Sequence, residues 1–211
     1  MDRARSLAGL RLAHLASSVG CEAPENLRRH KGWVGRLLEA TLGADATNAS
    51  AADFTELGIE LKTIPVDRQG RPRETTFVCS VPLAHPDETT WQTSSTKKKL
   101  SQVLWIPILC DDELDVAGRM VGSPLLWSPT PHQEHLLVTD WRDHLDVIRR
   151  GYVDSITARD GQVLQIRPKG ASADSRTWSV GPDGQSILTN PRAFYLRATF
   201  TGAILKRHFA L

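Results

Sequence analysis

The most constraining feature of this chain is the alternating run at residues 58–64, Gly-Ile-Glu-Leu-Lys-Thr-Ile. Apolar Ile59 and Leu61 alternate in this run with charged residues, which is the period-two pattern of a β-strand. Successive side chains of a strand point to opposite faces. We therefore expect the apolar pair to face a core, while Glu60 and Lys62 project together on the other side of the strand.

A third charged group precedes this strand. Asp53 lies before a Gly-containing turn that can bring its carboxylate back towards Glu60. Divalent cations such as Mg²⁺ prefer oxygen ligands and are often held by one or two carboxylates plus water. The backbone carbonyl of Leu61 could add a third oxygen, and Lys62 could stabilise charge that develops on a phosphate. The pattern favours metal-dependent phosphodiester hydrolysis, and the alternative is a solvated face with a surface ion pair.

Composition excludes several classes of protein. Among 211 residues, 40% are hydrophobic and 24% are charged, which is ordinary for a soluble globular protein. The net charge of +2 is too small for a polybasic tail protein, so affinity for nucleic acid must come from local clusters. The candidate clusters are Arg28-Arg29-His30-Lys31, Lys97-Lys98-Lys99, Arg167 with Lys169, and Lys206-Arg207.

Other motifs are weak or absent from the sequence. The three cysteines are odd in number and lack metal-type spacing, which favours a reducing compartment. No run reaches the 18 or so apolar residues that a membrane span needs, so we expect a cytoplasmic protein. His132 and His135 have no evident third ligand for zinc. A Gly-rich phosphate loop is also missing, which argues against nucleotide hydrolysis.

The predicted elements give an α/β or α+β class, in which helices surround a mixed sheet. We expect helices at 3–18, 25–30, 33–42, 95–100, 132–149 and 200–209, and strands at 58–64, 76–82, 103–109, 121–126, 153–158, 163–168 and 193–196. Strands 58–64 and 76–82 are expected to form a hairpin or lie adjacent, and Asp160-Gly161 indicates a second hairpin. Residues 171–190 are expected to be a loop. Acidic residues 110–117 suggest a division into lobes 1–110 and 111–211.

Three further positions have two interpretations each from the residues alone. Glu39 falls near the apolar stripe of helix 33–42, either at its solvated edge or aimed into a site. Arg167-Pro168-Lys169 ends a strand, either as an exposed terminus or as a groove contact, because Arg is well shaped to bind guanine. Tyr195 is either a core aromatic residue or a contact to a base.

Several segments, in order along most of the chain, match one family. They are Asn26 to Gly43 (NLRRHKGWVGRLLEATLG), Asp53 to Val66 (DFTELGIELKTIPV), Glu74 to Val78 (ETTFV), Leu104 to Pro107 (LWIP), Val121 to Pro129 (VGSPLLWSP), Ile156 to Arg159 (ITAR), Leu164 to Lys169 (LQIRPK) and Phe194 to Leu196 (FYL). With these segments the sequence resembles the MutH family of methyl-directed mismatch-repair endonucleases, which shares a fold with type II restriction enzymes. The Asp…Glu-x-Lys core alone is a weak signal, whereas the ensemble is specific.

The resemblance implies a function. The family binds duplex DNA containing GATC and nicks the unmethylated strand of hemimethylated sites 5′ to the G, using Mg²⁺ (one or two ions). MutL, loaded with MutS at a mismatch, activates it. We accordingly expect a cytoplasmic monomer with a restriction endonuclease-like mixed sheet, whose two lobes, a catalytic lobe 1–110 and a DNA-recognition lobe 111–211, form a DNA-binding cleft.

The resemblance also implies roles for single residues. Asp53, Glu60 and Lys62 match the catalytic motif, with Asp53, Glu60 and Leu61 as metal ligands, Glu39 as a supporting acidic residue and Lys99 as an auxiliary lysine. Lys31 and Gly32 match a DNA-contacting loop, and Arg167, Pro168, Lys169 and Tyr195 match the recognition region, where Lys169 and Tyr195 would sense the adenine. One departure is Arg197-Ala198, where the family has a second basic residue.

Two alternatives remain open from the sequence. A stand-alone GATC restriction enzyme would cut both strands and would usually need two active sites in a dimer. A non-catalytic DNA-binding module would use the acidic pair only structurally.

Overall fold

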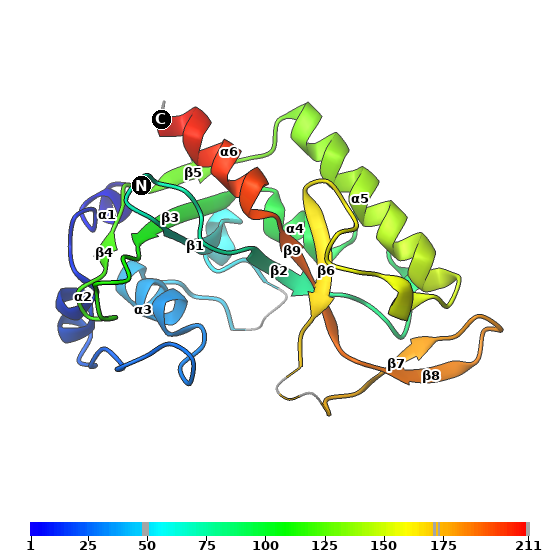
Figure 1. Cartoon of the computed structure of the whole chain (residues 1–211). Helices are drawn as coiled ribbons and strands as arrows, with labels where there is room; N and C mark the ends of the chain where they lie inside the picture. Colours follow the sequence, from blue (N-terminus) through cyan, green and yellow to red (C-terminus); the bar gives the residue numbers. More distant parts are fainter. Residues whose placement is uncertain (48–50, 171, 173, 210–211) are drawn as a thin grey trace. The chain divides into compact units, whose positions relative to one another are not determined.

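The structure is a computed structural model that describes residues 1–47, 51–170, 172 and 174–209 (Figure 1). The chain forms two compact units that interleave along the sequence. Unit 1 comprises Met1–Glu74, Ser101–Ser128 and Thr201–Leu211, and unit 2 comprises Thr75–Leu100 and Pro129–Phe200. The functional division into lobes 1–110 and 111–211 stays a prediction.

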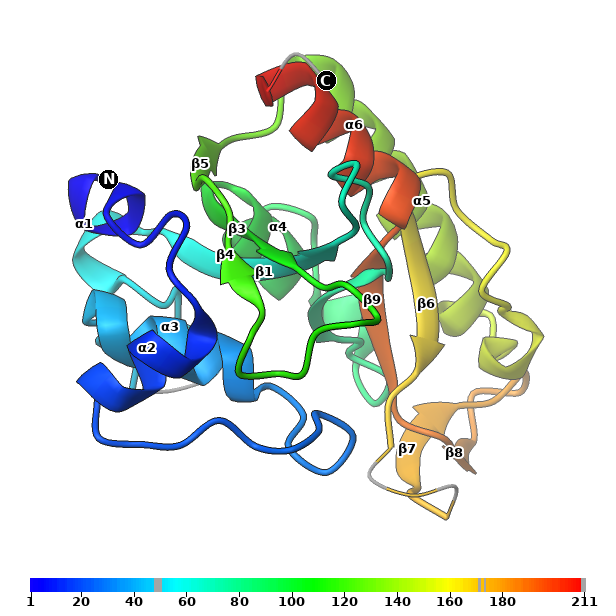
Figure 2. The ribbon, with the colours of Figure 1, turned by 60° about the vertical axis from the view of Figure 1, so that its left-hand side comes forward.

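Unit 1 is built on a mixed sheet. Its elements are helices α1 (Asp2–Arg5), α2 (Leu12–Ser18) and α3 (Trp33–Leu42), the 3-10 helix η1 (Thr55–Leu57), and strands β1 (Glu60–Val66), β3 (Val103–Leu109), β4 (Met120–Val121) and β5 (Leu125–Trp127). Strand β1 pairs with β3 in parallel, whereas β4 and β5 pair with β3 antiparallel. Figure 2 shows β1, β3 and β4 side by side. The mixed α/β class expected from the sequence is confirmed.

One face of this sheet carries the core of unit 1. Leu61 of β1 lies opposite Leu104 of β3 in the parallel register. Both are buried in a cluster with Leu37 and Leu38 of α3 and with residues of α2. Burying side chains of this size stabilises a fold by roughly 1.5–3 kcal/mol each. The prediction that Leu61 faces a core is therefore confirmed, and this packing fixes α3 against the strand that carries Glu60 and Lys62.

Unit 2 holds a second, antiparallel sheet. Its elements are strands β2 (Thr76–Ser80), β6 (Leu164–Pro168), β7 (Thr177–Val180), β8 (Ser186–Thr189) and β9 (Arg192–Leu196), helices α4 (Ser95–Leu100) and α5 (Pro131–Arg149), and the 3-10 helices η2 (Pro86–Glu88) and η3 (Val153–Ser155). The sheet has the order β2-β9-β6, and β7 and β8 form a separate hairpin. Helix α6 (Ala198–Phe209) begins in unit 2 and continues in unit 1.

The predicted pairing of the first two strands is wrong. The turn at 67–72 forms, with a bridge between Val66 and Pro72, but the pairing extends no further. Strand β1 pairs instead with the apolar strand β3, and β2 pairs with β9. Long-range burial decides the partners, because β3 offers apolar residues to both of its faces.

The predicted helix at 3–18 is wrong over its middle. Gly9 adopts a φ of 83°, and its N–H donates to the carbonyl of Val121. The N–H of Leu12 donates to the carbonyl of Arg119, and Arg11 forms an antiparallel β-bridge with Met120. The segment between α1 and α2 therefore adds to the edge of β4, and these pairings replace helical hydrogen bonds. The predicted helical turn at 25–30 is also wrong, because this segment contains only bends.

Pro107 lies in β3, the central strand of its sheet, although a proline has no N–H to donate to a strand pairing. Strand β5 pairs with residues 103–105 of β3 and β4 pairs with residues 108–109. Pro107 falls in the gap between them, so the missing N–H interrupts no ladder on that side.

The described helices contain none that is long and apolar enough to cross a membrane.

Candidate functional site

The site is built on a tight loop that joins Asp53 to β1. Phe54 and Ile59 form an antiparallel bridge, with backbone N–H to carbonyl distances of 3.0 and 3.3 Å. Gly58 closes this loop at a φ of 63°, a conformation that side chains with a Cβ disfavour. The loop returns the Asp53 carboxylate to β1, where its Oδ2 accepts the N–H of Leu61 at 2.7 Å. The expected return of Asp53 towards the strand is confirmed.

Glu60 and Lys62 project together from β1, as the alternation predicted. Lys62 Nζ lies 3.1 Å from Glu60 Oε1. The two residues are only 4% and 7% exposed, so this is a buried ion pair rather than a solvated face. Charged side chains are rarely buried to this extent unless they are paired or functional. The interpretation of these residues as an ordinary surface pair is therefore wrong.

Glu39 of α3 belongs to the same cluster. Its side chain is partly buried, and its pKa is raised, first by desolvation and then by the negative charges of Asp53 and Glu60. Arg36 and Lys62 oppose the shift. These electrostatic effects indicate that Glu39 faces the same group of charges. The structure thus gathers three carboxylates and one ammonium at the start of β1.

The cluster is not a ready-made metal cage. Among the described residues, no three His, Cys, Asp or Glu side chains are already arranged as ligands. Sites for Mg²⁺ usually use one or two carboxylates and several waters, so this observation does not conflict with a site of two carboxylates. Burial is the first cause of the raised pKa of Glu39, and the charges of Asp53 and Glu60 are the next; a divalent cation would neutralise those charges. The residues present therefore fit a hard divalent cation.

Three other predicted residues lie elsewhere in the two units. Lys99 is buried in α4 of unit 2. Lys31 is exposed immediately before α3, and its carbonyl accepts a hydrogen bond from Arg36 Nη1 at 3.2 Å. Gly32 is the N-cap of α3 with a φ of 77°, and a Cβ there would lie 3.2 Å from the Arg36 guanidinium. Gly32 is therefore conformationally required at the start of α3.

The predicted recognition residues meet on one face of the sheet in unit 2. Arg167 and Lys169 are exposed at the end of β6, on both sides of Pro168. The Arg167 guanidinium carbon lies 5.9 Å from the centre of the Tyr195 ring on β9. Arg167 also donates to the hydroxyl of Thr75 at 3.0 Å. The structure thus brings together residues that the resemblance assigned to the recognition region, and their role in recognition stays a prediction.

Sequence reasoning missed the centre of this face, which is Phe77. Lys169 Nζ lies 3.5 Å from the centre of the Phe77 ring, a cation–π contact. The Phe77 and Tyr195 rings pack edge to face at 5.6 Å. Phe77 sits in an apolar run that indicates only a strand, so the sequence alone gave no reason to single it out. Phe77 comes to lie opposite Tyr195 only through the long-range pairing of β2 with β9, for which the sequence carries no local signal.

Arg197, which directly precedes the departure at Ala198, has a structural role. Its guanidinium donates to the carbonyls of four consecutive residues, Ala158 to Gly161, at 2.7–3.2 Å. Arg197 therefore fixes the loop that precedes β6. This use of the side chain accounts for its presence without any contact to DNA.

A mixed α/β fold that draws an Asp, a Glu and a Lys together at the start of one strand is typical of nucleases. The comparisons with known proteins agree with this class. Residues 42–140 match the family model described as the DNA mismatch repair enzyme MutH. The chain is 51% identical over 208 residues to the DNA mismatch repair protein MutH of Serratia proteamaculans, covering 99% of this chain and 91% of that protein.

Two further relatives are similar over the full length. The MutH protein of Yersinia enterocolitica is 50% identical over 210 residues, and that of Escherichia coli K12 is 51% identical over 211 residues. Each alignment covers 100% of this chain and 92% of the relative. The chain therefore belongs to the MutH family of DNA mismatch repair enzymes. It is a mismatch repair endonuclease, and thus a hydrolase.

Proposed function

We propose that this endonuclease binds duplex GATC sites and nicks the unmethylated strand of hemimethylated DNA 5′ to the G, by Mg²⁺-dependent phosphodiester hydrolysis. The observation that carries the proposal is the convergence of Glu39, Asp53, Glu60 and Lys62 at the start of β1. The proposal includes a restriction endonuclease-like fold with a DNA-binding cleft, which the mixed sheet of unit 1 supports.

Asp53, Glu60 and the carbonyl of Leu61 are the proposed metal ligands. The N–H of Glu60 donates to Gln102 on the β3 side of the strand. Backbone groups of successive strand residues point to alternate edges, so those of Leu61 point to the other edge. There the N–H of Leu61 meets the Asp53 carboxylate, and its carbonyl faces the same edge. Two carboxylates and one carbonyl leave the remaining positions for water and a phosphate oxygen.

Bound Mg²⁺ would supply Lewis-acid polarisation of a phosphoryl oxygen and a more acidic water. The chain's own groups supply position and charge. Lys62 is held by Glu60 at 3.1 Å, so its ammonium is fixed where it can orient the attacking water or stabilise charge on the phosphate. Glu39 adds a carboxylate with a raised pKa, which can accept a proton more readily than an ordinary glutamate. Lys99 is proposed as an auxiliary active-site lysine.

Recognition is proposed for Arg167, Pro168, Lys169 and Tyr195, with Lys31 and Gly32 as further DNA contacts. The Arg167 guanidinium can donate two hydrogen bonds to O6 and N7 of guanine. An N6-methyl group on adenine removes one donor hydrogen and adds bulk. A tight contact from Lys169 or Tyr195 at that edge should lose about 1–3 kcal/mol on methylation. The contacts of both side chains with Phe77 support this role, because they restrain the two groups together.

MutL is the proposed activator, with MutS acting indirectly at the mismatch, and the enzyme is proposed to work as a monomer in the cytoplasm. A partner raises activity when it binds the competent conformation more tightly than the other conformations. This part of the proposal is supported by the membership of the MutH family.

The deciding experiment is a nicking assay with Mg²⁺ on unmethylated, hemimethylated and fully methylated GATC plasmids. We expect nicked circles from the first two substrates and none from the third. Asp53→Asn should abolish nicking, because the neutral amide still accepts the Leu61 N–H but binds the cation poorly. The matched control is Glu22→Gln, an exposed carboxylate outside the cluster. Loss of GATC binding by Asp53→Asn in metal-free buffer would mean that the site is misassigned.

The two rival functions predict other outcomes. A stand-alone restriction enzyme would give linear plasmid as the first product and would be a dimer on DNA. A non-catalytic DNA-binding module would show no cleavage at all, with or without Glu60→Ala.

A further inference from the structure

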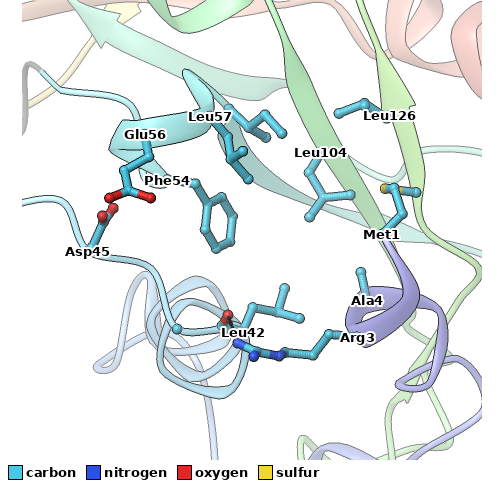
Figure 3. Close-up of a pocket in the computed structure, with 12 residues that line it drawn as sticks. Met1, Arg3, Ala4, Leu42, Asp45, Phe54, Glu56, Leu57, Leu104 and Leu126 are labelled. Carbon is cyan, nitrogen blue, oxygen red and sulfur yellow. Dashed lines mark hydrogen bonds between the residues drawn. The ribbon is translucent and has the colours of Figure 1, made fainter.

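Unit 1 contains a pocket that no part of the proposed chemistry uses. Its cavity volume is about 420 Å³, within the range of about 300–1,000 Å³ that is common for binding sites. Figure 3 shows the Phe54 ring pointing into it, between helix α1, helix α3 and strand β3. The apolar walls are formed by Leu42, Phe54, Leu57, Ile59, Leu104 and Leu126.

The apolar surface extends beyond the hollow to its mouth. Leu57 is 66% exposed and Leu126 is 37% exposed, and both line the pocket. A small molecule inside the hollow would leave this rim in water. A polypeptide would fill the hollow with one side chain and cover the rim with its flanking residues, which is the usual arrangement around an energetically dominant anchor. The exposed rim therefore favours a polypeptide as the occupant.

Charge on the rim narrows the chemistry of that occupant. Asp45 and Glu56 lie together on one side of the pocket (Figure 3). Asp45 accepts the N–H and the hydroxyl of Thr55 at 2.8 Å each, which lowers its pKa and keeps it anionic. On the other side, the Arg3 guanidinium donates to the carbonyl of Leu42 at 2.8 Å. The acidic side of the rim is complementary to a lysine or an arginine.

The pocket wall is also the loop that presents the candidate catalytic carboxylates. Phe54 and Ile59 line the pocket and bridge to each other. Asp53 directly precedes this bridge and Glu60 directly follows it. Successive side chains of an extended segment point to opposite sides, so Phe54 points into the pocket and Asp53 points away from it. A group that packs against Phe54 therefore also restrains the backbone that positions Asp53. Occupation of the pocket is thus mechanically linked to the 2.7 Å contact between Asp53 and the Leu61 N–H.

We propose that this pocket is a docking site for a partner polypeptide, which inserts one apolar side chain and places a lysine or arginine beside Asp45 and Glu56. Docking restrains the loop 53–60. The binding event is independent of the proposed function, whereas its consequence for cleavage rests on the proposed function.

The test is amide NMR on the full chain without DNA or metal. The probe is a blocked hexapeptide, Gly-Ser-Phe-Lys-Ser-Gly, and the matched control probe replaces Lys by Glu. We expect saturable shifts at the amides of residues 53–60, with millimolar affinity, and about fivefold weaker binding of the Glu probe, the scale of one exposed ion pair. Absence of saturable shifts, or equal binding of both probes, would overturn the proposal. Equally tight binding of phenethylamine would instead indicate a small-molecule site and overturn the polypeptide assignment.

Two variants of the protein test whether the peptide binds at the rim of this pocket. Leu57→Lys adds a positive charge to the rim and removes apolar surface, so it should weaken the Lys probe at least fivefold, roughly 1 kcal/mol. The matched control is Leu188→Lys, which changes a similarly exposed leucine on β8 and should leave binding unchanged. Equal effects of the two variants would contradict the proposed location. Asp53→Asn separates the two proposals, because failure of that variant to abolish nicking would refute the catalytic assignment while leaving probe binding intact.

Discussion

At the scale of single residues, the Glu39 carboxyl has the most informative surroundings. Its pKa lies above the usual glutamate value of 4.5, because burial and the charges of Asp53 and Glu60 disfavour the ionised form. The folded state therefore binds this proton more tightly than the unfolded chain. Stability from this group is fully present below pH 4.5 and is lost as the pH rises through the raised pKa of the folded state.

The corresponding variant is Glu39→Gln, which removes the charge and keeps the shape. In metal-free buffer at neutral pH, we expect a higher free energy of unfolding by about 0.5 kcal/mol, a small value because the group is partly solvated and screened. Denaturant titrations of both proteins at pH 4 and pH 7 measure this difference in the free energy of unfolding. The gain should disappear at pH 4, where wild-type Glu39 is protonated. A gain of the same size at both pH values would exclude charge repulsion as the cause.

A second prediction at this scale concerns Arg167. Its guanidinium stands over the Tyr195 ring at the exposed end of β6. If it contacts guanine, Arg167→Ala should weaken binding to GATC by about 1–3 kcal/mol and relax discrimination at the G·C pairs. Binding to GATC duplexes and to duplexes with altered G·C pairs measures this. Uniform weakening on all sequences would identify a phosphate contact instead.

At the scale of elements, helix α5 anchors strand β6, which carries the proposed recognition residue Arg167, through Asp140. This buried carboxylate accepts the backbone N–H groups of Gln162, Val163 and Leu164 at 2.7–2.9 Å. Removing it leaves buried donors unsatisfied, so Asp140→Ala should destabilise the fold by about 2–4 kcal/mol. Urea denaturation measures the loss. The exposed Asp143→Ala on the same helix is the control and should cause no comparable loss, because Ala favours helix more than Asp does. A similar loss there would mean that the hydrogen bonds of Asp140 are not the cause.

Two local predictions from the sequence failed because other contacts decide the structure of these segments. Asp160-Gly161 indicated a hairpin, but the Asp160 carboxylate accepts the N–H of Thr157 and closes a turn, while β6 pairs with β9. The loop expected at 171–190 contains the hairpin β7–β8, apart from residues 171 and 173, which lie outside the described residues. Its buried positions include the polar residues Ser179 and Thr189, whereas the apolar Trp178 and Leu188 are exposed, so hydrophobicity does not mark the buried face of this hairpin. Long helices with strong periodicity, such as α5, were predictable because their signal is local.

The residues of the candidate site likewise divide into those that a local signal predicts and those that it does not. Asp53, Glu60 and Lys62 could be predicted because one turn and the alternation of one strand bring them together. Phe77 could not, because its partners Lys169 and Tyr195 reach it only through the pairing of β2 with β9 and of β9 with β6. Strands β2 and β9 are separated by more than one hundred residues, and a pairing over that distance leaves no local trace in the sequence.

At the scale of the whole molecule, binding of a cation should appear as stability. A ligand that binds only the folded state adds about 1.4 kcal/mol at ten times its dissociation constant. For a chain of this length, that corresponds to a rise in Tm of roughly 3–6 °C. We expect Mg²⁺ to raise the Tm of the wild-type chain in the absence of DNA, because it neutralises the repulsion among Glu39, Asp53 and Glu60.

The location of that effect can be tested in the same samples. Hydrogen exchange should slow at β1 and at the loop 53–60 on addition of Mg²⁺, with no change in the hairpin β7–β8. Asp53→Asn should remove both the Tm shift and the protection, whereas Glu22→Gln should keep them. An equal Tm shift in Asp53→Asn would mean that Mg²⁺ stabilises the chain through another site, and the assignment of Asp53 as a ligand would fail.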